Sequence, residues 1–327
     1  MNKLLTIVVP VYKVEPYINK CLDSCVLTDE NLMSQLEVII VNDGTPDNSA
    51  EMSREYVKRY PNTFRQIDKK NGGHGSAWNV GLKEATGKFL RFLDSDDWLT
   101  NLDKLMLKLQ ETDADLVFTH RNTYYAGEGR DNISYFEPPY NHTVDTNSLS
   151  VDRFVELHFY AGFQSCTYKT SLLQPYYPLF SEGTRYDDSI LTILPIVVGK
   201  TYITYDFVVY NYLIGREEQT CARSALLKNC EQHNAEYGKM HNFVTNTDIS
   251  RVREQVDALM YRAFSDTMTL AIELPYIRRK KCIAYLKRYI PHQGTWKYSK
   301  QIQRYLRYPF VVAFAWDAIR SLKNKKG

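Results

Sequence analysis

Three carboxylates lie close together in the stretch FLDSDDWL, which runs from Phe92 to Leu99. Asp94, Asp96 and Asp97 directly follow an apolar run that is typical of a buried strand. Two carboxylates separated by one residue are suited to a hard divalent cation such as Mg²⁺ or Mn²⁺, which prefers oxygen ligands and brings bound phosphates with it. The alternative is that these residues cap a helix beginning near Leu99, a role that Asp97 could fill in addition to metal binding.

Polar residues also follow two other apolar runs. They are Pro10, Val11 and Tyr12 after the first run, and Asn42, Asp43 and Gly44 after the second. A carboxylate near an aromatic ring can bind a nucleobase, because the carboxylate accepts the N3 proton of uracil while the ring stacks. A simple Asp-Gly turn is the alternative explanation for Asp43.

Secondary-structure elements must position these residues. Over the first 120 residues, apolar runs alternate with helical patterns, as in a βαβ series. We expect strands at 4–11, 36–41, 64–67 and 88–93, with helices between them. One helix places Ile18, Cys21, Leu22 and Cys25 on one face, and a second spans 47–60 with Asp47 as its cap. Parallel strands bind ligands at their carboxyl ends, so the three polar clusters should converge on one cleft.

The rest of the chain is less regular. Residues 124–147 predict an irregular excursion, 164–168 and 201–212 predict strands, and the chain after Ser224 predicts mostly helix. The layout is an α/β domain, a mixed middle that extends the same sheet, and a helical C-terminal region.

Four segments carry a family resemblance. TIVVPVYK, VIIVNDGTPDNS, NGGHGSAWNVGL and FLRFLDSDDWL, in this order and spacing, resemble the successive blocks of glycosyltransferase family 2, nucleotide-sugar enzymes with the GT-A fold. The resemblance covers about residues 4–100 closely and extends more loosely to about 215. It implies an α/β, Rossmann-like GT-A domain with a mostly parallel central sheet, which we place over 1–222. The sequence pattern predicts that a helical region follows over 223–327.

The family's roles transfer to individual residues of this sequence. The resemblance implies a nucleoside pocket lined by Pro10, Val11 and Tyr12, uracil pairing by Asp43, ribose and diphosphate contacts near Asp94 and Ser95, a Mn²⁺ or Mg²⁺ ligand in Asp96, and a sugar-diphosphate loop at Asn71 and Gly72. One position departs from the pattern. Where many relatives have Arg, this chain has Trp78 before Asn79, so the contact of that Arg is absent or supplied elsewhere.

The stretch GTRYDDSIL resembles the family's acidic pair, with Asp in place of Glu. By this resemblance Asp188 is the catalytic base and Asp187 contacts the acceptor, the alternative being that the pair caps a helix. Further on, Arg216, Gln219 and Thr220 match a region that lies over the phosphates in relatives. For His74, contact with a phosphate or with solvent is favoured over a catalytic or metal-binding role.

Composition indicates an ordinary folded protein, with 44% hydrophobic and 24% charged residues. The six cysteines include no C-x-x-C pair, so we expect reduced, mostly buried thiols. The N-terminus lacks a small-residue cleavage site, and no apolar run reaches the roughly 20 residues of a membrane span. These features predict a cytoplasmic protein.

Charge is distributed unevenly along the chain. Residues 276–327 hold 14 Lys and Arg and one acid, a net charge of +13, and the remaining 27 basic and 37 acidic residues give −10. Aromatic side chains are interleaved with the basic ones, including Trp296, Tyr298, Tyr305 and Trp316. This composition favours peripheral association with an anionic membrane at the inner face of the plasma membrane, a solvated helical face or a homodimer contact being the alternatives. Nucleic acid is disfavoured because no recognised motif is present.

Together these features predict an inverting, metal-dependent transferase that moves one sugar from a UDP-sugar to a carbohydrate acceptor, such as a lipid-linked glycan, in surface polysaccharide assembly. Teichoic acid or a protein-linked glycan is the alternative acceptor. A sugar nucleotidyltransferase is disfavoured because PVYKVEPY holds no glycine-rich phosphate loop. A non-catalytic nucleotide- or glycan-binding module is disfavoured because Asp96 and Asp188 are both present.

Overall fold

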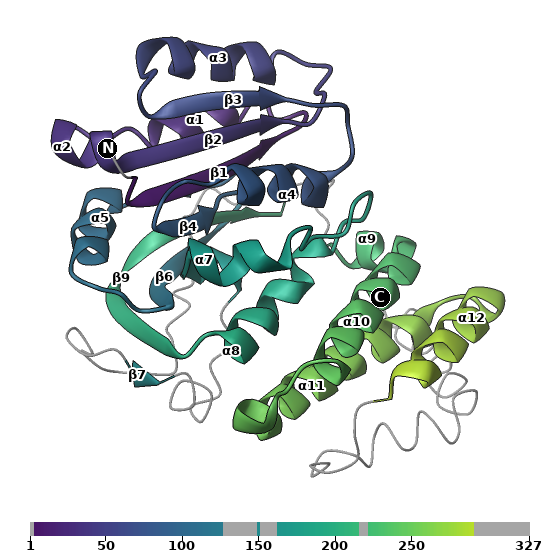
Figure 1. The fold of residues 1–327 in the computed structure, drawn as a ribbon. Helices are drawn as coiled ribbons and strands as arrows, with labels where there is room; N and C mark the ends of the chain where they lie inside the picture. Colours follow the sequence, from purple (N-terminus) through teal and green to yellow (C-terminus); the bar gives the residue numbers. More distant parts are fainter. Residues whose placement is uncertain (1–2, 127–148, 151–161, 216–221, 291–327) are drawn as a thin grey trace. The chain divides into compact units, whose positions relative to one another are not determined.

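The computed structural model describes residues 3–126, 149–150, 162–215 and 222–290. The chain divides into two compact units, residues 1–216 and 217–327. The described residues of the first unit form an α/β structure built on one sheet, and those of the second form helices (Figure 1).

Four parallel strands form one side of the sheet, in the order β3-β2-β1-β4. They are β1 (Leu5–Val11), β2 (Leu36–Asn42), β3 (Phe64–Asp68) and β4 (Phe89–Phe92). Every residue of β1, β2 and β4 is buried, as expected for continuous apolar runs covered by helices on both faces. The four strands predicted from the sequence are confirmed.

The sheet continues beyond β4 with mixed pairing, in the order β8-β6-β9-β5, and β7 pairs with β9. These strands are β5 (Trp98–Leu99), β6 (Leu116–Tyr125), β7 (Leu149–Ser150), β8 (Cys166–Lys169) and β9 (Thr201–Ile214). β8 is antiparallel to both β4 and β6, whereas β6 and β9 run parallel. The predicted strands near 164–168 and 201–212 thus extend the same sheet.

Short helices cover and connect the strands of the first unit. They are α1 (Ile18–Asp23), α2 (Glu30–Gln35), α3 (Ser49–Arg59), α4 (His74–Glu84), α5 (Leu102–Gln110), α7 (Thr170–Leu173) and α8 (Leu194–Val198), with 3-10 segments η1 (Phe163–Ser165), η2 (Gln174–Tyr176) and η3 (Asp187–Thr192). Ile18, Cys21, Leu22 and Cys25 are all buried, as the spacing predicted. The predicted cap of α3 is wrong by one residue. Asn48 occupies the N-cap position, and the Asp47 carboxylate instead accepts hydrogen bonds from the Ser49 amide and the Thr45 hydroxyl.

Helix α4 lies directly against β1 at a glycine. A Cβ atom added at Gly81 would lie 2.1 Å from Cγ1 of Val8, a separation that no side chain tolerates. This close approach sets α4 against the sheet, and the N-terminus of α4 carries His74.

The second unit contains α9 (Arg223–Lys228), α10 (Cys230–Thr245), α11 (Arg253–Glu273) and α12 (Tyr276–Leu286), with 3-10 segments η4 (Ser250–Val252) and η5 (Lys287–Tyr289). Its core includes Tyr237 on α10 and Phe264 on α11, whose ring centroids lie 5.6 Å apart. Among the helices of the described ranges, none has both the length and the apolarity required to cross a bilayer.

Candidate functional site

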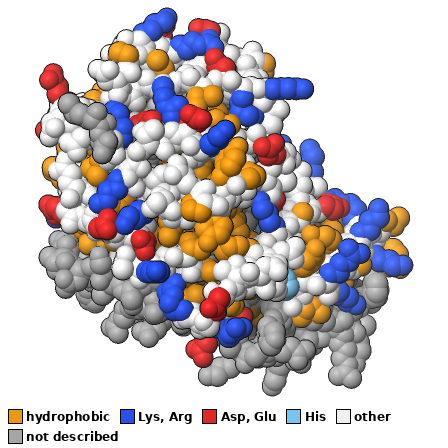
Figure 2. Space-filling view, viewed as in Figure 1, with side chains coloured by type: hydrophobic (Ala, Val, Ile, Leu, Met, Phe, Trp, Pro, Cys, Tyr) orange, Lys and Arg blue, Asp and Glu red, His pale blue; other side chains and the backbone are white. Residues whose placement is uncertain are grey.

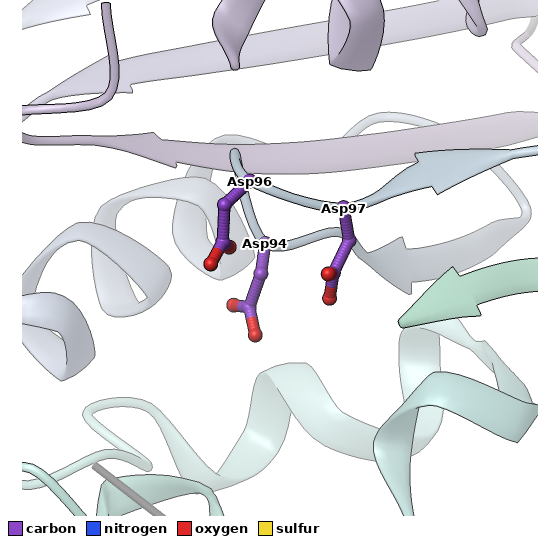
Figure 3. A group of neighbouring side chains, drawn as sticks. All are labelled: Asp94, Asp96 and Asp97. Carbon is purple, nitrogen blue, oxygen red and sulfur yellow. The ribbon is translucent and has the colours of Figure 1, made fainter. Parts of the chain in front are cut away.

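The acidic residues that follow β4 form a cluster (Figure 3). Carboxylate oxygens of Asp94, Asp96 and Asp97 all lie within 4.8 Å of one another. The three side chains leave the β4–β5 loop on the same side. The loop therefore concentrates negative charge at the carboxyl end of β4, adjacent to β1, as the parallel topology predicts.

Asp97 is held inside the fold. Its carboxylate accepts hydrogen bonds from the Tyr210 hydroxyl at 2.6 Å and from the Leu213 amide at 2.8 Å, both on β9. Burial, followed by repulsion from Asp94, raises the pKa of Asp97 well above its usual value. The prediction that Asp97 caps the next helix is wrong, because β5 intervenes and α5 begins only at Leu102, after an N-cap at Asn101. Asp97 instead fastens the acidic loop to β9.

His74 joins two acidic segments of the chain. Its Nε2 lies 3.0 Å from Oδ1 of Asp94, and its Nδ1 lies 2.9 Å from Oδ2 of Asp187. Because ionised carboxylates only accept hydrogen bonds, this geometry is satisfied when both ring nitrogens carry protons. Burial would lower the pKa of His74, but the two carboxylates outweigh it and raise the pKa well above its usual value. The sequence-based interpretation of His74 did not include these contacts: the imidazole bridges two site carboxylates, and a contact to phosphate remains a prediction.

Trp78 lies one helical turn after His74 on α4 and packs against its ring. Its ring centroid lies 4.2 Å from that of His74, 4.4 Å from Phe92 and 5.1 Å from Phe180. Its indole Nε1 is buried and has no hydrogen-bond partner within the described ranges. The residue that departs from the family pattern thus forms part of an aromatic core beneath the histidine.

Asn79, next to Trp78, positions the segment that precedes the acidic pair. Its side-chain oxygen accepts from the amides of Leu179 and Phe180, and its Nδ2 donates to the Phe180 carbonyl. The buried amide therefore pins residues 179–180 to α4.

The acidic pair Asp187 and Asp188 opens η3. Asp187 is 1% exposed, and its Oδ1 has no hydrogen-bond partner among the residues that the structure describes. Close packing holds it there, because a Cβ at Gly75 would lie 2.8 Å from Oδ2 of Asp187. Burial, and then repulsion from Asp187, raises the pKa of Asp188 to about 7, although the positive charge of His74 opposes the shift. A carboxylate with this pKa can accept a proton near neutral pH.

Asp43 organises the glycine-rich loop. Its Oδ1 accepts from the Lys69 ammonium at 2.6 Å and the Gly72 amide at 2.9 Å, and its Oδ2 accepts from the Gly73 amide at 2.8 Å. Gly73 has a φ of 89°, a backbone conformation that favours glycine. The side chain is almost fully buried, and a contact to uracil remains a prediction.

The loop also touches the segment that carries the acidic pair, because the Gly183 amide donates to the Gly72 carbonyl at 2.9 Å. Asn71, the other predicted loop residue, lies close to Gly44, where an added Cβ would be 3.0 Å from the Asn71 nitrogen. The loops after β2 and β3 are therefore packed together.

The predicted nucleoside residues lie at the adjacent strand end. Pro10 and Val11 end β1, and Val11 is in register with Asn42 of β2. The Tyr12 side chain follows and is 43% exposed. The Lys13 amide donates to the Thr45 hydroxyl at 2.8 Å, which joins the loops after β1 and β2. The structure thus brings the three predicted strand ends to one edge of the sheet, with Ser95 buried on the β4–β5 loop.

The donor set of the acidic loop fits a hard divalent cation. Asp94, Asp96 and Asp97 supply only oxygen atoms, which Mg²⁺ and Mn²⁺ prefer. Asp97 is buried, whereas Asp94 and Asp96 are partly exposed, so these two carboxylates are the more accessible to a cation.

Sequence reasoning missed Lys69, Tyr210 and the carboxylate contacts of His74. The partners of Tyr210 and His74 lie 113 residues away in the chain, at Asp97 and Asp187. A local pattern carries no signal for such contacts. Lys69 had a usable signal, since it lies two residues after the predicted strand 64–67, whose end meets the site. Arg216, Gln219 and Thr220 lie outside the described residues.

Comparison with known proteins identifies the family of the chain. The model of glycosyl transferase family 2 matches residues 6–169, half of the chain, and the protein belongs to this family. EpsJ of Bacillus subtilis (strain 168), described as an uncharacterized glycosyltransferase, is 40% identical over 119 residues, which are 36% of this chain and 33% of EpsJ. The minor teichoic acid biosynthesis protein GgaB of the same organism is 38% identical over 96 residues, which are 29% of this chain and 11% of GgaB.

Among solved structures, S. aureus TarS 1-349 in complex with UDP-GlcNAc superposes with a TM-score of 0.69 at 20% identity, covering 88% of this chain and 80% of TarS 1-349. This confirms the predicted GT-A fold. The chain matches about a third or less of the length of these two curated relatives.

Proposed function

We propose that this protein is an inverting, metal-dependent glycosyltransferase that moves a single sugar from a UDP-sugar to a carbohydrate acceptor. The observation that carries the proposal is the meeting of two acidic segments. Asp94 of the loop after β4 and Asp187 of η3 contact the same imidazole, which places a candidate metal loop next to a candidate base. Family membership and the UDP-GlcNAc bound to the fold neighbour TarS support this donor class.

In the proposed reaction, an acceptor hydroxyl oxygen attacks the anomeric carbon of the donor. A new C–O bond forms, the bond between that carbon and the diphosphate oxygen breaks, and UDP leaves with the bonding electron pair. The hydroxyl proton passes to the carboxylate of Asp188, whose pKa of about 7 suits a general base near neutral pH. Mn²⁺ or Mg²⁺ held by Asp96, with Asp94 beside it, would supply neutralisation of charge on the diphosphate.

The charges of the site support this assignment. His74 offsets Asp94 and Asp187, and it opposes the upward shift of the Asp188 pKa. We assign His74 a positioning role, since it holds Asp187 beside Asp188 and fixes the Asp94 carboxylate. Asp43, Tyr12, Asn71 and Gly72 are proposed to bind the nucleotide, by family resemblance and by their common place at the sheet edge.

The proposed setting is assembly of a surface polysaccharide at the cytoplasmic side of the membrane, with a lipid-linked glycan as acceptor. The similarity to GgaB favours teichoic acid as a second candidate acceptor. We assign residues 1–222 to catalysis and residues 223–327 to a membrane or dimer contact.

The deciding experiment incubates the purified protein with Mn²⁺, a panel of sugar nucleotides and glycan acceptors, and measures UDP release together with the mass of the product. A glycosyltransferase releases UDP and adds one sugar to the acceptor. Release of pyrophosphate from UTP and a sugar 1-phosphate would instead identify a nucleotidyltransferase. Binding without turnover for every donor and acceptor pair would identify a binding module.

A further inference from the structure

The surface of α12 combines positive charge with exposed apolar side chains (Figure 2). Counted from Ile277, the positions Lys280, Lys281, Ala284, Lys287 and Arg288 follow at 3, 4, 7, 10 and 11 residues. This spacing places them on one side of the helix and its extension η5, and all six residues are exposed. We call these six residues the basic face of α12.

The basic residues of this segment divide into two groups. Arg278 pairs with Glu231, and Arg279 is buried and donates to the Leu274 carbonyl, so both stabilise the helical unit. The four basic side chains of the basic face form no ion pair within the described part of the chain. Residues 276–290 contain no acid.

Exposed apolar side chains lie at both ends of residues 276–290. Ile277 is 71% exposed and Tyr276 is 61% exposed, the two highest values among the large hydrophobic side chains that the structure describes. Ile290, at 37%, lies at the other end of the same segment. Helices that lie in a membrane interface combine Lys and Arg with exposed apolar side chains in this way.

We propose that the basic face of α12 docks on the surface of an anionic bilayer, with Ile277 entering the headgroup region. Lys280, Lys281, Lys287 and Arg288 would face lipid phosphates. Each basic side chain near such a surface raises the partition coefficient by roughly fivefold. This assignment rests on the described residues alone and does not depend on the aromatic residues beyond 290, which lie outside them.

Two other partners fit the observations less well. A symmetric dimer through this face would bring the four basic side chains of one copy against the same four of another, which is unfavourable. A nucleic acid backbone would match the charge but would leave Ile277 and Tyr276 exposed. A bilayer accommodates both the charge and the apolar side chains.

The test is flotation of the full-length protein with vesicles of phosphatidylcholine, with and without phosphatidylglycerol, at low and high salt and without nucleotide. We expect binding to the anionic vesicles only, weakened by salt. Lys280→Glu combined with Lys281→Glu should lower the affinity by at least about tenfold, and Lys287→Glu with Arg288→Glu should do the same. Ile277→Ser should lower it several-fold.

Matched controls come from the first unit. Lys58→Glu combined with Lys83→Glu makes the same change in net charge at exposed helical positions, and Leu107→Ser removes another exposed apolar side chain, which is 49% exposed. Both should bind vesicles as the unaltered protein does, and circular dichroism checks that every variant is folded.

Three results would overturn the proposal. The first is absence of wild-type binding to anionic vesicles, and the second is an equal loss in the control variants. The third is a change of oligomeric state on Ile277→Ser, measured by light scattering, with vesicle binding unaltered; this would make the face a protein contact. Since vesicle binding needs no sugar transfer, failure here leaves the proposed transferase activity untouched, and the converse also holds.

Discussion

At the scale of single residues, His74 is the side chain on which the candidate site depends most. It contacts one carboxylate 20 residues further along the chain and another 113 residues further along. Its positive charge lies among Asp94, Asp187 and Asp188, and its ring packs at a tilt against that of Trp78. The imidazole therefore influences both the position and the protonation of the acidic groups.

The base assignment predicts a specific loss of chemistry. Asp188→Asn removes the proton acceptor without altering the residues proposed to bind nucleotide. Transfer should fall by about 10²- to 10⁴-fold, while the affinity for UDP stays nearly unchanged. Kinetics and calorimetry with UDP measure the two effects. Transfer at the normal rate would show that Asp188 is not the base.

The pH dependence follows from the pKa of Asp188. Because the base must be ionised, kcat/KM of the unaltered protein should fall as the pH drops below about 7. In His74→Gln the positive charge that lowers the pKa of Asp188 is lost. The pH below which kcat/KM falls should therefore be higher in this variant. The activity at pH 7 should then fall by on the order of tenfold.

A pH profile of kcat/KM for both proteins measures the shift. A purely structural role for His74 would lower the rate equally at every pH and would leave unchanged the pH at which kcat/KM begins to fall. Such a result would contradict the electrostatic role assigned to this residue.

The metal assignment concerns a third residue. Asp96→Asn should abolish turnover that depends on added Mn²⁺ or Mg²⁺, because the loop loses a charged oxygen ligand. Asp103→Asn, at an exposed acid of α5, is the matched control and should behave normally. Turnover is measured against metal concentration. An unchanged metal dependence in Asp96→Asn would exclude Asp96 as a ligand.

At the scale of elements, the sequence predicted the parallel part of the fold well. Continuous apolar runs identified β1, β2 and β4, and the parallel topology then correctly brought their polar ends to one edge. The place of Asp97 was not predictable, because its partner Tyr210 belongs to a strand that joins the sheet much later in the chain. Asp187 and Asp188 were identified by family resemblance, since their local pattern equally suits a helix cap.

Packing between α4 and β1 gives a prediction about stability. Alanine favours a helix over glycine by about 1 kcal/mol, so Gly81→Ala would stabilise an isolated helix. In this protein the added Cβ would collide with Val8, and we expect a net destabilisation of about 1–3 kcal/mol. Urea unfolding measures it, with Lys83→Ala on the exposed face of α4 as control. A more stable Gly81→Ala protein would contradict the close approach of helix and strand.

At the scale of the whole molecule, the two units differ in chemistry. Residues 1–216 carry a net charge of −7 and residues 217–327 carry +10. The described site residues all belong to the first unit, whereas the basic face of α12 belongs to the second. Donor binding and membrane binding should therefore be separable.

A chain ending at residue 222 tests this separation. The α/β unit has its own buried sheet, and the described residues proposed to bind the donor lie within it. We expect the shortened chain to bind UDP in the presence of Mn²⁺ with an affinity within about threefold of the full chain. It should fail to float with anionic vesicles, since the basic face of α12 is missing and the remaining chain is more acidic. Calorimetry and flotation measure the two properties, after circular dichroism has shown that the shortened chain is folded. A folded short chain that binds UDP more than about tenfold more weakly would place donor contacts in the helical unit.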